Sequence, residues 1–323
     1  MDSIQNSPLS DDLSALAWVH EELRKSLDSA HKALNRCLKE SAAVGQSDLD
    51  ALDPAVLRTA RQQIHQGVGA LELSGLTAGA TLLRSSEALV QKFVNRPQSI
   101  TEDAVRDIER ASFALLDYIS RKLAGKPVPA LAMFPQYEAL AARLGNTMAR
   151  PIDLWSQDWP TVSLESPLQP PASATARDAD ANTIGDFETG LLMLMRGQLG
   201  QGAKLADLCA SLAASANARK SHREAATWML ASGFLEALST SRIPLSVHAK
   251  RVLSSLLSQL RVLAKGQAVP SDRLAHELLF FCAQAGEAPS KLNSVLANVR
   301  KTFGLDRHVP VDLVSSSLGR YDP

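Results

Sequence analysis

Apolar residues recur at helical spacing through most of this chain. In its first part, the pattern covers residues 11–40, 54–73, 77–94 and 101–125. Each stretch carries one apolar stripe, as a helix does when a single face is buried. The stripe of the second stretch consists of Leu57, Ala60, Ile64, Gly67 and Leu71. Because short connections join the four stretches, the pattern predicts an antiparallel four-helix bundle over residues 1–125.

Residues 126–180 break this pattern. Short stretches with scattered aromatic residues lead into Gln169 to Asp180, which is rich in proline, alanine and charge. Such a composition is typical of a flexible linker. We therefore expect an irregular segment followed by a linker, with the aromatic residues anchoring the segment on the bundle.

Helical periodicity resumes at residue 181 and predicts a second all-helical domain over residues 181–308. Its expected helices cover residues 181–216, 219–239, 245–265, 270–285 and 288–303. An extended tail is expected over residues 309–323. No repeat of fixed length is evident, but the succession of helix pairs leaves a helical solenoid open as an alternative.

The composition favours an all-α fold and argues against several classes of function. Aromatic residues make up only 5% of the chain, whereas strands draw on aromatic and β-branched residues. The 34 basic and 34 acidic residues cancel, without the basic excess of a nucleic-acid-binding protein. Cys37, Cys209 and Cys282 are isolated from one another and form no Cys/His pair typical of a metal site. We expect reduced, partly buried thiols, no metal, no cofactor and no nucleic acid.

Membrane targeting is not expected from the sequence. Met1 to Asp12 is polar and acidic, unlike a secretory signal peptide. A helix that spans a bilayer needs ~20 apolar residues, and runs such as Leu191 to Met195 are far shorter. We therefore expect a cytoplasmic protein without membrane insertion.

The candidate chemistry lies at His65. This residue follows Ile64 of the buried stripe, so it lies about 100° round the helix on a half-exposed flank. Gly69 comes one turn later and leaves room for a docking partner. A histidine in such a position can present an imidazole nitrogen to a second protein.

Glu87 is the expected partner of His65. The Ser74-Gly75 break predicts a turn between two antiparallel helices, with His65 about ten residues before it and Glu87 about eleven after it. The two side chains then fall at the same height. We expect Glu87 to accept a hydrogen bond from Nδ1–H of His65, which fixes the tautomer and leaves Nε2 free to attack a phosphoryl group.

This stretch resembles the histidine phosphotransfer (HPt) domain at the N-terminus of CheA-type chemotaxis kinases. That family's motif is roughly H-x-x-K-G, a second glycine six residues later, and a glutamate on the next helix. His65 falls on the phospho-accepting histidine, Gly69 and Gly75 on the two glycines, and Glu87 on the glutamate. The resemblance implies that His65 carries a phosphoryl group while Glu87 orients the imidazole.

Two positions depart from the family's motif. Val68 stands in place of the lysine, which removes a cation beside the phosphate. Arg84 stands where a histidine is often found, and its charge makes it a possible phosphate contact. We expect Arg61, Val68 and Gly69 to form the surface that docks a partner.

The resemblance extends through both halves of the chain. The sequence is similar to the N-terminal region of the large CheA-like hybrid kinases that control type IV pili and twitching motility, and to the related pilus-regulator family FimL. It is carried by IHQGVGAL (64–71), FALLDY (113–118), FPQY (134–137), DLW (153–155), GFLEAL (233–238), AHELLFFCA (275–283) and GRYDP (319–323). The partners it implies are a histidine-kinase catalytic domain and a response-regulator receiver domain, or pilus-regulatory proteins.

Three functions remain open from the sequence. The first is a phosphorelay or docking module of the chemosensory system for type IV pili; the second is a non-catalytic helical scaffold or adaptor; the third is an unrelated helical-repeat adaptor. The 323 residues contain no glycine-rich nucleotide-binding box and no phosphate loop, so we expect no autophosphorylation. As a fragment, the chain would be the N-terminal part of a protein histidine kinase.

The other histidines are interpreted as surface or boundary residues. His276-Glu277 suggests the start of a zinc-binding HExxH motif, but Phe280 occupies the position of the second histidine. We therefore dismiss a zinc site there.

Overall fold

The computed structural model describes residues 8–43, 54–126, 128–155, 168–267, 271–286 and 294–309. All regular secondary structure in these ranges is helical, which confirms the all-α prediction. Contacts divide the chain into two compact units, whose described residues lie within Met1–Ser156 (unit 1) and Gln157–Pro310 (unit 2). Residues 310–323 of the expected tail, with the GRYDP segment, lie outside the described residues.

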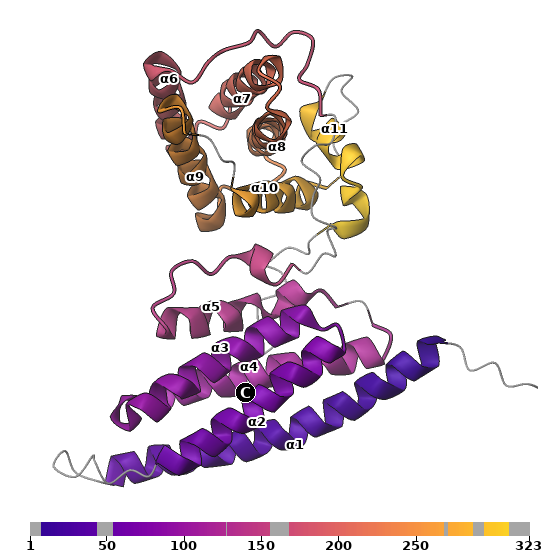
Figure 1. The fold of residues 1–323 in the computed structure, drawn as a ribbon, viewed down its shortest axis with the longest axis vertical. Helices are drawn as coiled ribbons and strands as arrows, with labels where there is room; N and C mark the ends of the chain where they lie inside the picture. The colour runs from indigo at the N-terminus through magenta and orange to yellow at the C-terminus, as the bar shows by residue number, and fades with distance from the viewer. Residues whose placement is uncertain are drawn as a thin grey trace, which may run out of the picture. The chain divides into compact units, whose positions relative to one another are not determined.

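Unit 1 is built on four long helices: α1 (Pro8–Ala43), α2 (Pro54–Leu73), α3 (Thr77–Asn95) and α4 (Glu102–Leu123) (Figure 1). Helix α2 packs against α1 and α3, and α4 contacts both α3 and α1. Because α4 returns to α1, the four helices form a closed bundle rather than a stack of helix pairs. Helices α1 and α4 are antiparallel, since His31 and Asn35 of α1 bond Ser112 and Glu109 of α4 in reverse order. Helices α2 and α3 are antiparallel for the same reason, since Arg61 and His65 bond Gln91 and Glu87 in reverse order.

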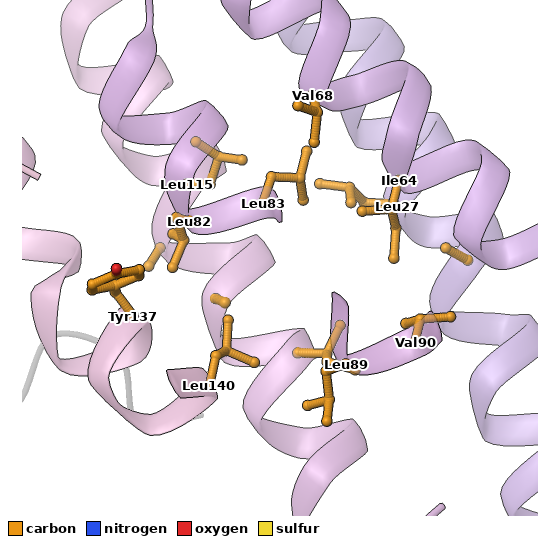
Figure 2. Packing of buried hydrophobic residues seen from close by; sticks show 14 of the residues in the cluster. Leu27, Ile64, Val68, Leu82, Leu83, Leu89, Val90, Leu115, Tyr137 and Leu140 are labelled. Atoms are coloured by element: carbon orange, nitrogen blue, oxygen red, sulfur yellow. The ribbon is translucent and has the colours of Figure 1, made fainter. Parts of the chain in front are cut away.

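The core of the bundle is the set of apolar stripes that the sequence displays. Leu27, Ile64 and Leu83 are almost fully buried and meet at its centre (Figure 2). Burying each such side chain contributes about 1.5–3 kcal/mol. Gly67 belongs to the same stripe because a Cβ there would lie 2.7 Å from Cδ2 of Leu23 and 3.0 Å from Cδ2 of Leu83.

A Schellman turn ends α2 and fixes how α3 pairs with it. Gly75 adopts a φ of 69°, which only glycine reaches easily. Its N–H donates to the carbonyl of Glu72 at 3.0 Å, and the N–H of Leu76 donates to that of Leu71 at 2.8 Å. This pattern satisfies the last carbonyls of the helix, and the buried Leu76 seals the turn.

The segment 126–180, which we expected to be irregular, contains a helix. After a 3₁₀ turn at Ala130–Met133, α5 (Phe134–Arg143) packs against α3 and α4. Phe134, Tyr137 and Leu140 are buried, and the hydroxyl of Tyr137 donates to Asp153 Oδ2 at 3.1 Å. The helix escaped prediction because its apolar stripe spans only ten residues, too few to establish a period.

Unit 2 holds α6 (Ala181–Met195), α7 (Gln201–Ala218), α8 (His222–Ser239), α9 (Val247–Ala264), α10 (Asp272–Gln284) and α11 (Val295–Thr302) (Figure 1). Instead of the single helix expected over 181–216, Gly197 with a φ of 90° ends α6 and α7 follows. Helix α8 is buried on every face from Glu224 to Leu235, and α7, α10 and α11 all contact it.

Polar residues fix the helices around α8. Glu236 accepts hydrogen bonds from Ser294 Oγ at 2.6 Å and from the Leu296 N–H at 2.9 Å, so its carboxylate caps α11. Negative charge at a helix N-terminus is stabilising. The buried Arg300 donates to the carbonyl oxygens of Cys282 and Ala283, each at 2.8 Å, and thereby joins α11 to the end of α10.

Candidate functional site

His65 and Glu87 meet on the surface of unit 1, one from α2 and the other from α3. Nδ1 of His65 lies 3.1 Å and 3.2 Å from the two carboxylate oxygens of Glu87. The neighbouring Ile64 is fully buried, so the helix geometry turns His65 outward, and 57% of its side chain is exposed. The turn at Gly75 sets the register that brings the two residues to one level.

The pair belongs to a row of polar contacts that we call the α2–α3 seam. It consists of Arg61, His65 and Glu72 on α2 and of Arg84, Glu87 and Gln91 on α3. Arg61 Nη1 donates to Gln91 Oε1 at 2.5 Å, and Arg61 Nε lies 3.5 Å from Glu87 Oε1. Arg84 forms an ion pair with Glu72. His65 thus lies between two arginines, each of which has an acidic or amide partner.

The contact with Glu87 defines the tautomer of His65. A carboxylate only accepts hydrogen bonds, so Nδ1 carries the proton and Nε2 keeps its lone pair in neutral imidazole. Within the described residues, Nε2 has no hydrogen-bond partner. An exposed imidazole with a free lone pair and an oriented ring has the basic requirements of a nucleophile.

The structure places Val68 differently from the expected docking surface. It is 4% exposed and lies beside Leu83 inside the bundle (Figure 2). The reason is helical spacing: Val68 comes one turn after the buried Ile64 and joins the core stripe. Of the three residues expected to form that surface, Arg61 and Gly69 are partly exposed. A Cβ added at Gly69 would have nothing within 4 Å.

Gln91 and Glu72 are members of the seam that our sequence analysis did not identify. Gln91 could have been found, because it follows Glu87 by four residues as Arg61 precedes His65 by four. Residues four apart lie on the same face of a helix. Glu72 follows His65 by seven residues and so shares its face of α2, but its pairing with Arg84 could not be predicted, because exposed side chains have several possible partners.

A second histidine of unit 1, His31, lies in a different environment. Its Nε2 is 3.0 Å from Ser112 Oγ, and the Ser112 hydroxyl donates to the carbonyl of Ile108 at 3.0 Å. The hydroxyl oxygen therefore accepts from Nε2–H. Burial lowers the pKa of His31, although the nearby Glu109 and Asp28 carboxylates act to raise it. These contacts give His31 a structural role between α1 and α4.

The structure gives less support to a metal site, a membrane-spanning helix or a ligand pocket. Within the described ranges, no group of three His, Cys, Asp or Glu side chains is placed to hold a metal ion. The helices in these ranges are also too short or too polar to cross a membrane. Unit 2 has a pocket of about 860 Å³ between α7, α8 and α11. The carboxylate of Glu236 lines this pocket, but it is already engaged as the cap of α11.

Comparison with known families bears on unit 2. Residues 172–315 match the family model of the FimL scaffold protein second domain. The match spans α6 to α11 and includes the GFLEAL and AHELLFFCA segments. This similarity supports a FimL-like scaffold. No curated protein and no solved structure matches the chain. The bundle with His65 lies outside the matched residues, and its resemblance to HPt domains stays a prediction.

Proposed function

We propose that this chain is a cytoplasmic scaffold of type IV pilus regulation whose bundle serves as a phosphorelay module, with His65 as the phospho-accepting residue. Its partners are a histidine-kinase catalytic domain and a response-regulator receiver domain, or other pilus-regulatory proteins. The scaffold part of the proposal is supported by the family match of residues 172–315. The phosphorelay part is supported by the hydrogen bond between Glu87 and Nδ1 of the exposed His65.

The proposed transfer uses the two nitrogens of His65 differently. Nε2 attacks the γ-phosphorus of ATP bound to the kinase domain. The Nε2–P bond forms, and the bond between the γ-phosphorus and the bridging oxygen breaks with its electron pair on ADP. The Nδ1 proton stays on the imidazole, and the Glu87 carboxylate offsets the positive charge of the ring. A receiver aspartate then attacks the phosphorus, and the electron pair of the Nε2–P bond returns to Nε2.

Phosphorylation of the purified chain tests this assignment. We expect acid-labile phosphate on the protein after incubation with a chemosensory kinase domain and ATP, and none on His65→Gln. His222→Gln is the matched control, because His222 is an exposed histidine of unit 2. Equal labelling of His65→Gln and the wild type would exclude His65 as the acceptor.

A second candidate function is a docking surface that carries no phosphate. It is favoured by Val68, which is buried where the family's motif has a lysine, and by Arg84, which is engaged with Glu72. This function predicts that His65→Gln leaves twitching motility intact. Charge reversal at Arg61 or Arg84 would instead abolish partner binding, which pull-down with the pathway's receiver proteins would measure.

A further inference from the structure

The facing helix carries an arginine near the height of position 68, where the motif has its lysine. His65 is level with Glu87, and Arg61 is level with Gln91, as their hydrogen bonds show. The same antiparallel register puts Arg84 level with Val68, about 4.5 Å along the bundle axis from His65. Arg84 therefore lies on the exposed side of α3 at the height at which the family has its lysine on the facing helix.

In the present structure this arginine is held by Glu72. Glu72 follows His65 by seven residues, which is close to two helical turns, so both side chains lie on one face of α2 about 10 Å apart along the axis. Arg84 and Glu72 form an ion pair whose side chains are 55% and 44% exposed. An ion pair with this exposure contributes little to stability and can be exchanged for another.

Arg61 is less suited to the same exchange. It is bound to Gln91 and lies against Glu87, so moving it would disturb the carboxylate that orients His65. The ion pair of Arg84 with Glu72 shares no residue with the hydrogen bond between His65 and Glu87, so its release removes no contact of that bond. Arg84 is therefore the cation of the seam that can turn toward an anion without dismantling the site.

We propose that Glu72 gates the anion site beside His65: it holds Arg84 in the unphosphorylated bundle and gives it up when a phosphoryl group arrives on Nε2. This inference rests on the proposed role of His65 for its biological meaning. A phosphoryl group presents up to two negative charges and three acceptor oxygens, whereas Glu72 presents one charge and two oxygens. Glu72 thus sets how strongly the site attracts a phosphate before transfer.

Titration with inorganic phosphate tests the gate without any phosphotransfer. The full chain, Glu72→Gln and Arg84→Gln are compared by the NMR shifts of the amides of α2 and α3 around His65. We expect Glu72→Gln to bind phosphate more tightly than the wild type, by up to about fivefold for release of an exposed pair. Arg84→Gln should bind more weakly, and the double variant should match Arg84→Gln.

Glu21→Gln is the matched control. It removes the same charge and releases Arg24 from an exposed pair on α1, away from the seam. If Glu72→Gln binds phosphate no more tightly than Glu21→Gln, the proposal that Glu72 gates the anion site is wrong. If phosphate binding follows the expected order but a kinase domain never labels His65, the anion site and its gate stand while the phosphorelay function fails. The two failures are thereby distinguished.

Discussion

The polar side chains of unit 1 fall into those whose polar atoms have hydrogen-bond partners and those whose polar atoms have none. On the α2–α3 seam, each charged residue faces a complementary group, and His65 is oriented by Glu87. Inside the bundle, Ser112 uses its hydroxyl twice, toward Ile108 and His31. Ser86 is the contrasting case, because it is 0% exposed and its hydroxyl has no hydrogen-bond partner. Such differences determine what each substitution does to stability.

Ser86→Ala should stabilise the protein. A buried hydroxyl without a partner loses its hydrogen bonds to water, which costs about 1–3 kcal/mol, and alanine also favours the helix. We expect the free energy of unfolding to rise by about 1 kcal/mol in urea denaturation. Ser112→Ala, which removes a bonded hydroxyl at an equally buried position, should lower it. A loss of stability in Ser86→Ala would contradict this reading of its environment.

The stability of unit 1 should fall on acidification because of His31. Burial holds the pKa of His31 below its ordinary value, which is about 6.5. Between these two pKa values the unfolded chain binds more protons than the folded chain. The stabilisation is therefore complete above about pH 6.5 and decreases as the pH falls through the folded-state pKa. Urea denaturation between about pH 7.5 and 5 should show a steeper decrease for the wild type than for His31→Gln; equal slopes would refute the assignment.

The level of His65 with Glu87 could be predicted by counting residues from a recognisable turn, since helical rise is constant. The burial of Val68 follows in the same way from its spacing to Ile64, although the family's motif has an exposed type of residue, lysine, at that position. The pairing of Arg84 with Glu72 could not be predicted, because long exposed side chains reach several partners at similar free energy.

At the scale of helices, glycines show where two backbones come close and where they do not. Gly69 lies inside α2 with open space around it, whereas a Cβ at Gly202 of α7 would lie 3.0 Å from the Leu235 carbonyl oxygen of α8. A carbonyl of a packed helix cannot move aside as a flexible side chain can. Glycine is therefore required for packing at Gly202 but not at Gly69.

Alanine substitution at these two positions should have opposite effects. Gly69→Ala should raise the free energy of unfolding by about 1 kcal/mol, because glycine is the poorer residue inside a helix. Gly202→Ala should lower it by about 1–3 kcal/mol through overpacking of α7 against α8. Thermal or urea denaturation measures both. A neutral result for Gly202→Ala would mean that α7 can shift away from α8 at no loss.

The four helices of the bundle were predictable from the sequence, whereas α5 and the division between α6 and α7 were not. Helices α1 to α4 follow from apolar stripes of several turns, and their closure into a bundle follows from short connections. In unit 2 the break at Gly197 was missed because apolar residues continue up to Met195 and resume in α7. Glycine inside an apolar pattern does not by itself say whether the helix stops.

The whole molecule separates its candidate functions between two units. Unit 1 carries the seam with His65, and unit 2 carries the match to the FimL scaffold protein second domain.

Each unit has its own apolar core, and that of unit 2 contains two thiols. Burial raises the pKa of Cys282 to about 12 and raises that of Cys209 well above its usual range.

These two thiols should report the unfolding of unit 2. At about pH 8 only a thiolate reacts quickly with thiol reagents, so neither Cys209 nor Cys282 should be labelled in the native protein. Both should react once denaturant opens the unit. Leu192→Cys on α6, at a site where the leucine is 60% exposed, provides the control that reacts at once. Native labelling of Cys282 at the rate of this control would show that the core of unit 2 opens locally.

The burial of α8 on every face also has a consequence for biosynthesis. The helix leaves the ribosome together with α7, but α10 and α11, which cover its other sides, follow only with residues 272–302. During that interval an apolar surface of the nascent chain has no partner, and exposed apolar surface promotes aggregation. We therefore expect chaperones to contact the nascent chain at this stage of synthesis. A chain that is cut before α10 should express poorly, because this surface of α8 then stays uncovered.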